Sequence, residues 1–558
     1  MFIYFHCYMP ETWDAQVKAG LVRNGDGIRF SQSVDIEERL KFNNLARIGG
    51  ELYNYVKEHR CPFYIDRLQG GCFLEEYPYD MELADEYRSM LGDKFWGFQM
   101  HEWVSNFRSD LLKITSNNCP EWTEKAITET IHRAYPFEHT FLEAMNAKEY
   151  AALGGVPENY VEHLKILYDL FARRQKLVGG DVLPCDSWLA APKLEIELGA
   201  KRLMPEIGGQ TRNTRIQLAY ARGMARSAGI PFGAYYEPWE TKTLTACCYH
   251  REGKNEWNIS AESFPFQATG ENGGSSRSLQ MRLHLYAYMA GASFMAEEWG
   301  MCNTFYDWKD FELSPYGKVK KDFLDFVDRH PDIGKPITPV AVVLPKDMPV
   351  LDINLTADSY LEYAVEGRFA KVISDVYEAM KYLFVDSAPM IGTETENLRN
   401  YITPDAIDII HEDSPTVNEY KILVDCTENP EFAALHKDRI KPLRDVRRLM
   451  NELLPVHLDG GASMQITKND TTGDRYVLLM NNSGVVRTVE DGEALMPEGE
   501  ICVGLTTEEG VSLCCLEGNG SAVKTGENTY KVTLPSGGWL FGLFKNPLKH
   551  RKEPITEI

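Results

Sequence analysis

The chain has 558 residues, of which 44% are hydrophobic and 25% are charged, which is the composition of an ordinary globular protein. A chain of this length is expected to fold as about two to four domains rather than around one core. Its formal net charge of −23 argues against nucleic acids and anionic membranes as partners, because both would be repelled.

Nothing in the sequence predicts a membrane segment or a secreted protein. No run of about eighteen or more uncharged apolar residues occurs, as a transmembrane helix would need. The apolar start MFIYFHCYMP lacks the basic region and cleavage site of a signal peptide, and it is interpreted as the first strand of the fold. The twelve cysteines form no CxxC pair with metal-ligand spacing, and scattered cysteines in a long chain indicate free thiols in a reducing compartment. The sequence therefore predicts a cytoplasmic protein.

Residues 1–335 alternate short apolar runs with longer amphipathic stretches, which is the pattern of a parallel sheet with crossover helices. Eight strands are predicted, in chain order, over 2–9, 27–33, 61–67, 95–102, 181–188, 201–209, 230–237 and 292–300. Eight such units predict a (β/α)8 TIM barrel of the α/β class. The extra length falls at about 103–180, which is predicted to be a helical insertion over the barrel mouth.

The pattern changes after the barrel. Residues 336–456 carry two strands that are apolar on both faces, between amphipathic helices, and they predict a flavodoxin-like α/β domain. Residues 457–547 show short strands separated by Gly, Asn and Asp turns, which is typical of an antiparallel β-sandwich. The basic tail 548–558 is interpreted as a solvated terminus.

Acidic residues stand at the ends of several predicted barrel strands. Glu102 ends the fourth strand, Glu237 ends the seventh, Glu206 belongs to the end of the sixth, and Glu297 and Glu298 end the eighth. In a TIM barrel the C-terminal ends of the strands surround the active-site mouth. Because Glu297 and Glu298 are adjacent, their side chains point to opposite sides of the strand, and at most one of them faces the mouth.

Aromatic residues gather at the same strand ends, and rings together with carboxylates suit a sugar and the cleavage of a glycosidic bond. The residues predicted to contact a sugar are His101, Trp103, Asp66, Arg67, Arg29, Trp188, Glu206, Tyr235, Trp239, Glu298 and Trp299. For Asp66, Arg67 and Arg29 a structural ion pair fits the sequence equally well, and for His101 the alternative is a buried core histidine. No ligand spacing indicates a metal, and no cofactor is predicted.

The Gly- and Ser-rich stretch ATGENGGSSRS, residues 268–278, lacks the spacing of phosphate-binding loops. It is interpreted as a loop that precedes a helix, with the helix capped by Ser276 or Ser278.

Glutamates at the ends of the fourth and seventh strands resemble the catalytic pair of the clan A retaining glycoside hydrolases. The order of barrel, flavodoxin-like domain and small β domain resembles the family 42 β-galactosidases. The resemblance implies a retaining exo-β-glycosidase of the β-galactosidase type, with Glu102 as general acid and base and Glu237 as nucleophile. It differs at His101, where the clan typically has Asn. It also implies a carbohydrate substrate and a homo-oligomer with contacts through the flavodoxin-like domain.

Other functions fit the same residues. One is an inverting hydrolase that uses Glu206 or Glu298, or a lyase on the same barrel. Another is a non-catalytic carbohydrate-binding protein built on a hydrolase-like barrel. The sugar, the linkage and the aglycone depend on one or two hydroxyl contacts from loops, and they do not follow from the sequence.

Overall fold

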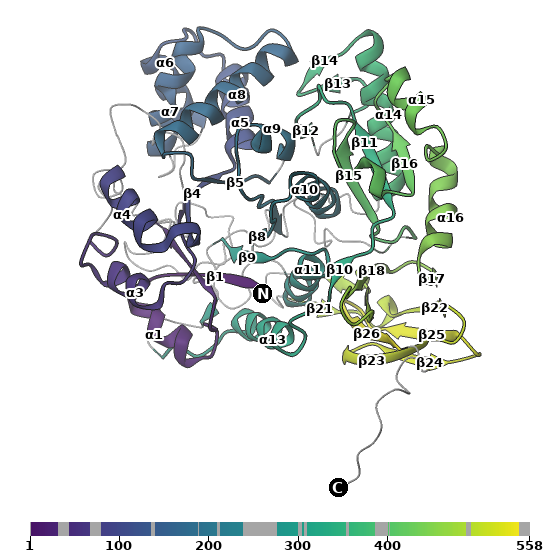
Figure 1. Ribbon diagram of the computed structural model, residues 1–558. Helices are drawn as coiled ribbons and strands as arrows, with labels where there is room; N and C mark the ends of the chain where they lie inside the picture. The colour runs from purple at the N-terminus through teal and green to yellow at the C-terminus, as the bar shows by residue number, and fades with distance from the viewer. Residues whose placement is uncertain are drawn as a thin grey trace.

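The N-terminal part of the chain supplies eight parallel strands in the computed structural model (Figure 1). They are β1 (Ile3–Cys7), β2 (Gly27–Ser31), β3 (Phe63–Asp66), β4 (Phe95–His101), β5 (Val182–Cys185), β7 (Glu206–Gly208), β8 (Ala234–Glu237) and β9 (Phe294–Glu297). Hydrogen-bonded neighbours follow the order β5-β4-β3-β2-β1-β9-β8-β7. The backbone N–H of Glu206 donates to the carbonyl of Asp186 at 3.0 Å, which brings the two edge strands together and nearly closes the barrel. Each strand lies within its predicted range, so the predicted TIM barrel is confirmed.

The structure describes most of the chain. The described residues are 2–31, 44–66, 80–134, 140–187, 189–208, 213–237, 276–298, 304–305, 310–352, 356–384, 400, 402–486 and 493–545. The basic tail that the sequence predicts at 548–558 lies outside them.

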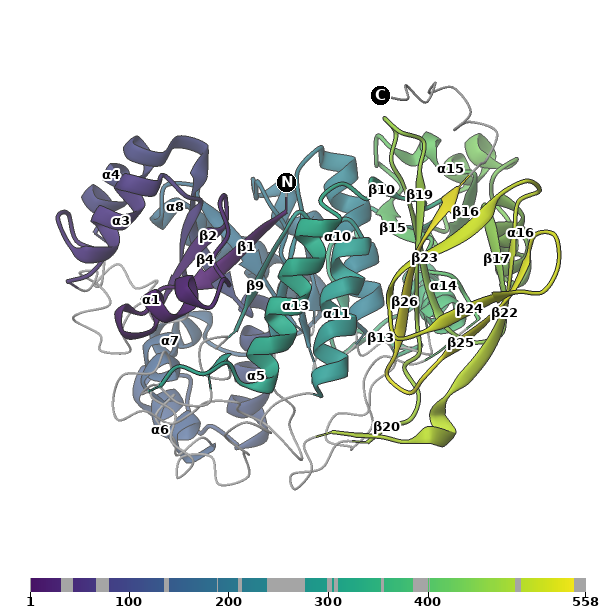
Figure 2. The same cartoon turned by 90° about the horizontal axis from the view of Figure 1, so that it is seen from below.

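Helices surround the barrel strands. They are α1 (Pro10–Lys18), α3 (Glu51–His59), α4 (Met81–Leu91), α9 (Pro192–Glu197), α10 (Thr214–Ala228), α11 (Arg277–Met289) and α13 (Pro315–Arg329), with the short 3-10 helix η2 (Gly92–Lys94) before β4. The side chain of Ser276 accepts a hydrogen bond from the backbone N–H of Leu279 and caps α11, which confirms one of the two predicted caps. Figure 2 shows α11 and α13 side by side between the barrel strands and the C-terminal sheets.

Four further helices occupy the segment after β4, where the sequence predicts an insertion. They are α5 (Trp103–Ser116), α6 (Glu124–Ala134), α7 (Thr140–Leu153) and α8 (Tyr160–Leu177). In Figure 1 they stand together on one side of the barrel. The segment is therefore helical, and its place over the barrel mouth stays a prediction.

The barrel strands present alternate side chains to the inside and to the helices, as the pleat of a strand requires. Tyr235 and Ala296 belong to a small apolar cluster inside the barrel, whereas Tyr236 and Met295 belong to the large core shared with the helices. The inner cluster comprises Phe5, Tyr64, Trp96, Leu183, Cys185, Met204, Tyr235, Phe294 and Ala296. By the same alternation Glu237, two residues after Tyr235, faces inward.

Three parallel strands form a separate sheet after the barrel, β11 (Val340–Leu344), β15 (Ile407–His411) and β16 (Ile422–Asp425), in the order β15-β11-β16. Helices α14 (Gly367–Phe384), α15 (Pro430–His436) and α16 (Leu443–Leu453) accompany it (Figure 1). In chain order the strands lie second, first, third, which is how the flavodoxin order 2-1-3-4-5 begins. The full flavodoxin-like domain stays a prediction.

Helix α10 joins this sheet to the barrel. A Cβ atom on Gly223 would come within 2.2 Å of the carbonyl oxygen of Ile409, so only glycine allows the helix to lie this close to β15. Beside it, the guanidinium Nε of Arg222 lies 2.5 Å from a carboxylate oxygen of Asp408.

Two pairs of short strands lie outside these sheets. The two-residue strand β6 (Leu189–Ala190) pairs with β12 (Leu351–Asp352), and β13 (Ser359–Tyr360) pairs with β14 (Tyr363–Ala364).

The C-terminal part is antiparallel. One sheet has the order β10-β18-β19-β26-β23 and another has the order β17-β22-β25-β24, and β20 pairs with β21. Their bounds are β10 (Lys335–Pro336), β17 (Val456–Asp459), β18 (Ser463–Lys468), β19 (Arg475–Met480), β20 (Val485–Val486), β21 (Ala494–Leu495), β22 (Ile501–Thr507), β23 (Ser512–Gly518), β24 (Ser521–Lys524), β25 (Thr529–Leu534) and β26 (Trp539–Lys545). The β-sandwich and the domain boundaries near 335 and 456 stay predictions.

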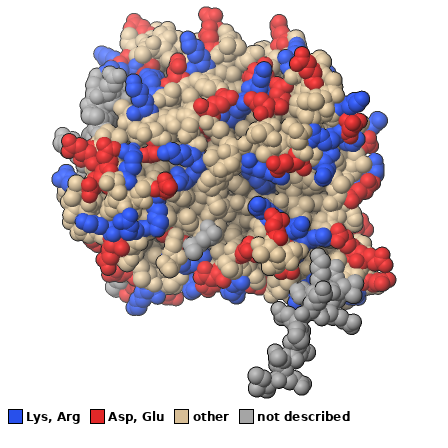
Figure 3. Space-filling model, viewed as in Figure 1, with Lys and Arg blue, Asp and Glu red and all other residues tan. Residues whose placement is uncertain are grey.

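Basic and acidic side chains are interspersed over the face shown in Figure 3. None of the described helices combines the length and the apolar character that crossing a bilayer requires.

Candidate active site

Four glutamates meet at the C-terminal end of the barrel strands, with Glu206 among them. Burial raises the pKa of Glu206 well above its usual value, and the charges of Glu102, Glu237, Glu298 and Asp186 raise it further. Nε2 of His101 lies within 3.9 Å of carboxyl oxygens of Glu206, Glu102 and Glu298, and Glu237 pairs with Gly208, two residues after Glu206 on β7. The predicted convergence of Glu102 and Glu237 at one place is thus supported by their common neighbour.

His101 stands among the same carboxylates. Its Nε2 lies 3.5 Å from Oε2 of Glu102, 3.4 Å from Oε1 of Glu298 and 3.9 Å from Oε1 of Glu206. On the other side of the ring, Nδ1 lies 3.4 Å from the amide nitrogen of Gln99. His101 is buried, and its ring packs edge-on against Tyr235 of the inner cluster while Nε2 faces the acids.

Glu102 occupies the turn between β4 and α5 in a left-handed backbone conformation, with φ 44° and ψ 38°. For a residue with a Cβ atom this conformation costs about 1–2 kcal/mol. The Oγ of Ser187 donates to Oε1 of Glu102 at 2.8 Å, and 29% of the Glu102 side chain remains exposed. Strained backbone of this kind is characteristic of functional sites. The Glu102 carboxyl group is both held in place and accessible.

Glu237 ends β8 and is almost fully buried. Its strand pairs in parallel with β7, where Gly208 lies directly beside it. A Cβ atom on Gly208 would come within 2.7 Å of the Cβ of Glu237 and 2.2 Å of its carbonyl oxygen. The glycine at 208 therefore makes room for Glu237.

The side chains of the two adjacent acids at the end of β9, Glu297 and Glu298, point to different surroundings, as predicted. Oε2 of Glu297 lies 2.9 Å from Nζ of Lys320, and its Oε1 lies 3.3 Å from Nε2 of His284, both on helices outside the strands. Glu298 instead lies beside His101. Only Glu298 belongs to the site.

Arg29, Asp66 and Tyr235 form a buried group inside the barrel. Arg29 makes an ion pair with Asp66, and its Nη1 donates to the hydroxyl of Tyr235 at 3.0 Å. All three side chains are fully buried. The ion pair fits the structural alternative for Arg29 and Asp66, and the Tyr235 ring packs in the inner cluster, so the sugar contacts of these three residues stay predictions.

Trp103 is buried in the core of the structure, and its predicted sugar contact stays a prediction. Helix α5 begins directly after Glu102, which turns the indole toward the helices. There the ring packs edge-on against Phe171, with ring centroids 5.0 Å apart, and Nε1 donates to Oε1 of Glu195 at 3.1 Å. Arg67, Trp188, Trp239 and Trp299 lie outside the described residues and stay predictions.

Several residues of the site were not among the predicted ones. Cys185 and Gln99 face the barrel interior beside His101, and Ser187 holds Glu102. Asp186, an acid near the end of the predicted fifth strand (181–188), accepts from the backbone N–H groups of Val104 at 2.8 Å and Ser105 at 3.0 Å, and so caps α5. Alternation along the strand provides the signal for Gln99, which lies two residues before His101 and hence on the same face.

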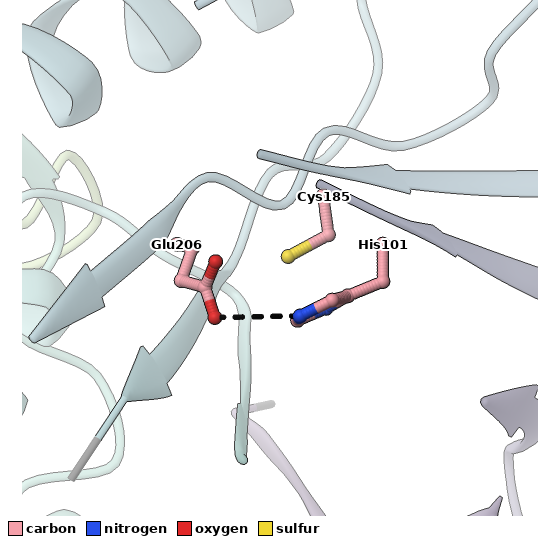
Figure 4. Close-up of side chains that lie close together, drawn as sticks. All are labelled: His101, Cys185 and Glu206. Carbon is pink, nitrogen blue, oxygen red and sulfur yellow. Dashed lines mark ion pairs between the residues drawn. The ribbon is translucent and has the colours of Figure 1, made fainter. Parts of the chain in front are cut away.

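The described residues contain one group whose donor types and spacing suit a metal ion. It consists of His101, Cys185 and Glu206, all buried, with their donor atoms within 4.8 Å of one another. The three side chains come from β4, β5 and β7, and they point toward one another (Figure 4).

No protein-family model matches this chain, and no curated protein sequence is detectably similar to it. The structure of the chain is similar to that of an alpha-L-fucosidase isoenzyme 2 from Paenibacillus thiaminolyticus. The two share 10% sequence identity and a TM-score of 0.46, and the match covers 98% of this chain and 99% of that one. It is also similar to a beta-galactosidase from the haloarchaeon Halorubrum lacusprofundi, at 10% identity and a TM-score of 0.41, over 97% and 98%. A glycoside hydrolase family 30 subfamily 8 xylanase from Clostridium acetobutylicum follows at 7% identity and a TM-score of 0.33, over 98% and 95%. Similarity at these values assigns no activity to this chain.

Proposed function

We propose that this protein is a retaining exo-β-glycosidase of the β-galactosidase type. One observation supports the proposal: at the C-terminal end of the barrel, Glu102 lies beside His101, whose other neighbours include Glu206, and Glu237 ends the strand next to that of Glu206, paired with Gly208. This is the end at which TIM-barrel enzymes place their catalytic groups. Two carboxyl groups at one site are what glycosidic-bond cleavage requires.

The different surroundings of the two glutamates suggest their roles. Glu102 is partly exposed and accepts a hydrogen bond from Ser187, so it can exchange protons with a leaving group and with water. Glu237 is buried at its strand end, where an attacking carboxylate is shielded from water. Glu102 therefore suits the acid and base role, and Glu237 suits the nucleophile.

The reaction runs in two steps. In the first, the Glu102 carboxyl group gives its proton to the glycosidic oxygen while a Glu237 oxygen attacks the anomeric carbon, and the bond to the aglycone breaks. In the second, the Glu102 carboxylate takes a proton from water, and the water oxygen attacks the same carbon and releases Glu237. Two inversions give net retention, which requires the two carboxyl groups to stand roughly 5–5.5 Å apart.

The first test is the stereochemistry of the product. A panel of nitrophenyl β-glycosides, including galactoside, glucoside, fucoside and mannoside, identifies the preferred sugar. Proton NMR of that reaction is expected to show the β-anomer of the free sugar first, with the α-anomer appearing only through mutarotation. An α-anomer formed first would contradict retention, and binding of the glycosides without turnover would contradict an enzyme.

An inverting hydrolase is the second candidate. Glu206 lies inside the cluster, and its two carboxyl oxygens have no hydrogen-bond partner among the described residues, so it is not committed to a structural contact there. An inverting enzyme needs carboxyl groups roughly 6.5–9.5 Å apart, with water between them. The same NMR experiment distinguishes the two candidates.

A further inference from the structure

Beside the proposed catalytic pair, the barrel holds a group of buried donors that the glycosidase mechanism does not use. A ring nitrogen of His101, Sγ of Cys185 and a carboxylate oxygen of Glu206 lie within 4.8 Å of one another (Figure 4). The exposed fraction is 2% for His101 and 1% for both Cys185 and Glu206. A nitrogen, a sulfur and an oxygen donor on three strands of a rigid barrel therefore surround one point.

Glu206 gives an independent sign that something is bound there. Both of its carboxyl oxygens are buried and have no hydrogen-bond partner among the described residues. A buried polar group left without a partner costs about 1–3 kcal/mol. A cation between Glu206, Cys185 and His101 would remove that cost, because a carboxylate oxygen would become its ligand.

The donor set selects the metal. Imidazole, thiolate and carboxylate together suit Zn²⁺, whereas Mg²⁺ and Ca²⁺ prefer oxygen donors alone. Catalytic zinc sites typically have three protein ligands and a fourth position that is open to water or substrate. Tetrahedral zinc bonds of about 2.0–2.3 Å place ligand atoms roughly 3.3–3.8 Å apart. The 3.9 Å between His101 and Glu206 is already close to this spacing.

Charge and the surrounding contacts fit as well. A thiolate at Cys185, a carboxylate at Glu206 and a neutral His101 balance the two positive charges of Zn²⁺. Zinc-bound histidines usually donate their second ring N–H to a neighbouring acceptor. The side-chain amide nitrogen of Gln99 lies 3.4 Å from Nδ1 of His101, and the amide oxygen has no hydrogen-bond partner among the described residues. If the amide group is rotated by 180°, this oxygen accepts the hydrogen bond from the Nδ1–H of His101.

From these contacts we propose that His101, Cys185 and Glu206 bind one Zn²⁺ ion at the C-terminal end of the barrel, with the fourth position open to water or to a substrate hydroxyl. The site differs from the sequence expectation of no metal, because its three ligands are far apart in the chain. It does not depend on the glycosidase proposal, since metal binding is measured without turnover.

Cobalt provides the test, because a thiolate ligand to Co²⁺ gives a charge-transfer absorption band in the near ultraviolet. The full-length protein is freed of metal with a chelator and titrated with Co²⁺ and then Zn²⁺. We expect a band that saturates at one equivalent of Co²⁺ and disappears when Zn²⁺ displaces it. Cys185→Ser is expected to abolish the band, and Glu206→Gln to weaken Zn²⁺ binding by about tenfold or more.

Cys426→Ser is the matched control, because Cys426 is equally buried but lies next to β16, outside the barrel. It is expected to leave the band unchanged. Thermal unfolding of each variant without metal shows whether it is folded. A folded wild-type protein that gives no band would overturn the proposal, as would a band that persists in Cys185→Ser or vanishes in Cys426→Ser. Loss of hydrolysis with the band intact would count against the glycosidase proposal alone.

Discussion

Glu237→Gln and Glu102→Gln are each expected to remove nearly all hydrolysis of the preferred nitrophenyl β-glycoside. General acid and base catalysis contributes typically about 10²–10⁴-fold, so Glu102→Gln should lower kcat/KM by that amount. Glu237→Gln should cost at least as much, because an amide cannot form the covalent intermediate. Glutamine keeps the shape of both side chains, and at 102 its carbonyl oxygen can still accept from Ser187. The loss therefore reports chemistry rather than folding.

Glu195→Gln is the matched control for these two variants. Glu195 is also a buried glutamate, but it lies on α9 and accepts from the indole of Trp103. Burial raises the pKa of Glu195 to about 8, so at pH 7 it is mostly protonated already and glutamine removes little charge. We expect unchanged kcat/KM in this variant. Full activity in Glu102→Gln or Glu237→Gln would contradict the assigned roles.

Lys320→Met is expected to produce a large loss of stability with no direct effect on the chemistry. Burial alone would raise the pKa of Glu297, but Lys320 and His284 outweigh it and hold the pKa well below its ordinary 4.5. Methionine keeps most of the apolar stem of Lys320 and leaves the Glu297 charge buried without its main partner. Removing one member of such a pair costs about 3–5 kcal/mol. Urea unfolding of the barrel at pH 7 measures this cost.

The pH dependence of this effect has a definite sign. In the wild-type protein Glu297 has a lowered pKa, so its contribution to stability is present above pH 4.5 and is lost as the pH falls toward the folded-state pKa. In Lys320→Met the pKa is expected to rise above 4.5, so the variant loses stability as the pH rises. The difference between the two proteins should therefore be larger at pH 7 than at pH 4.

The neighbouring lysine supplies the control. Nζ of Lys321 lies 2.8 Å from Asp325 in a partly exposed pair on the same helix, and such pairs contribute only about 0.2–1 kcal/mol. Lys321→Met should therefore change stability little. Equal unfolding midpoints for Lys320→Met and the wild-type protein would show that the buried pair is not stabilising as described. If the double variant Lys320→Met with Glu297→Gln regains the stability that Lys320→Met loses, the stabilising role of the buried pair is supported.

The barrel could be predicted from the sequence because its strands are short apolar runs, several of which end at or next to an acid. Phe95–His101 is fully buried, and the acid that follows it reaches the mouth. Alternation along a strand also predicted that Glu297 and Glu298 would separate, since it depends only on the pleat. Apolar runs and the alternation of side chains depend only on residues that are close in the chain, so they can be recognised in the sequence.

The rest of the site depends on contacts between distant segments. His101, Cys185 and Glu206 come from three different strands, and nothing in their spacing along the chain shows that they meet. Trp103 was predicted to contact the sugar because it is one of the aromatic residues at the strand ends, yet α5 begins at Trp103 and its ring packs against Phe171 in the core. Arg29 and Asp66 fitted two interpretations, and their pairing inside the barrel is seen only in the structure.

The most direct measurement is to trap the glycosyl-enzyme intermediate. A 2-deoxy-2-fluoro-β-glycoside of the preferred sugar, with a dinitrophenyl leaving group, forms the intermediate but slows its hydrolysis. Peptide mass spectrometry of the treated protein is expected to find one sugar, attached to the side chain of Glu237. A sugar attached to Glu206, Glu298 or Glu102, or turnover of the natural glycoside with no adduct at all, would contradict Glu237 as the nucleophile.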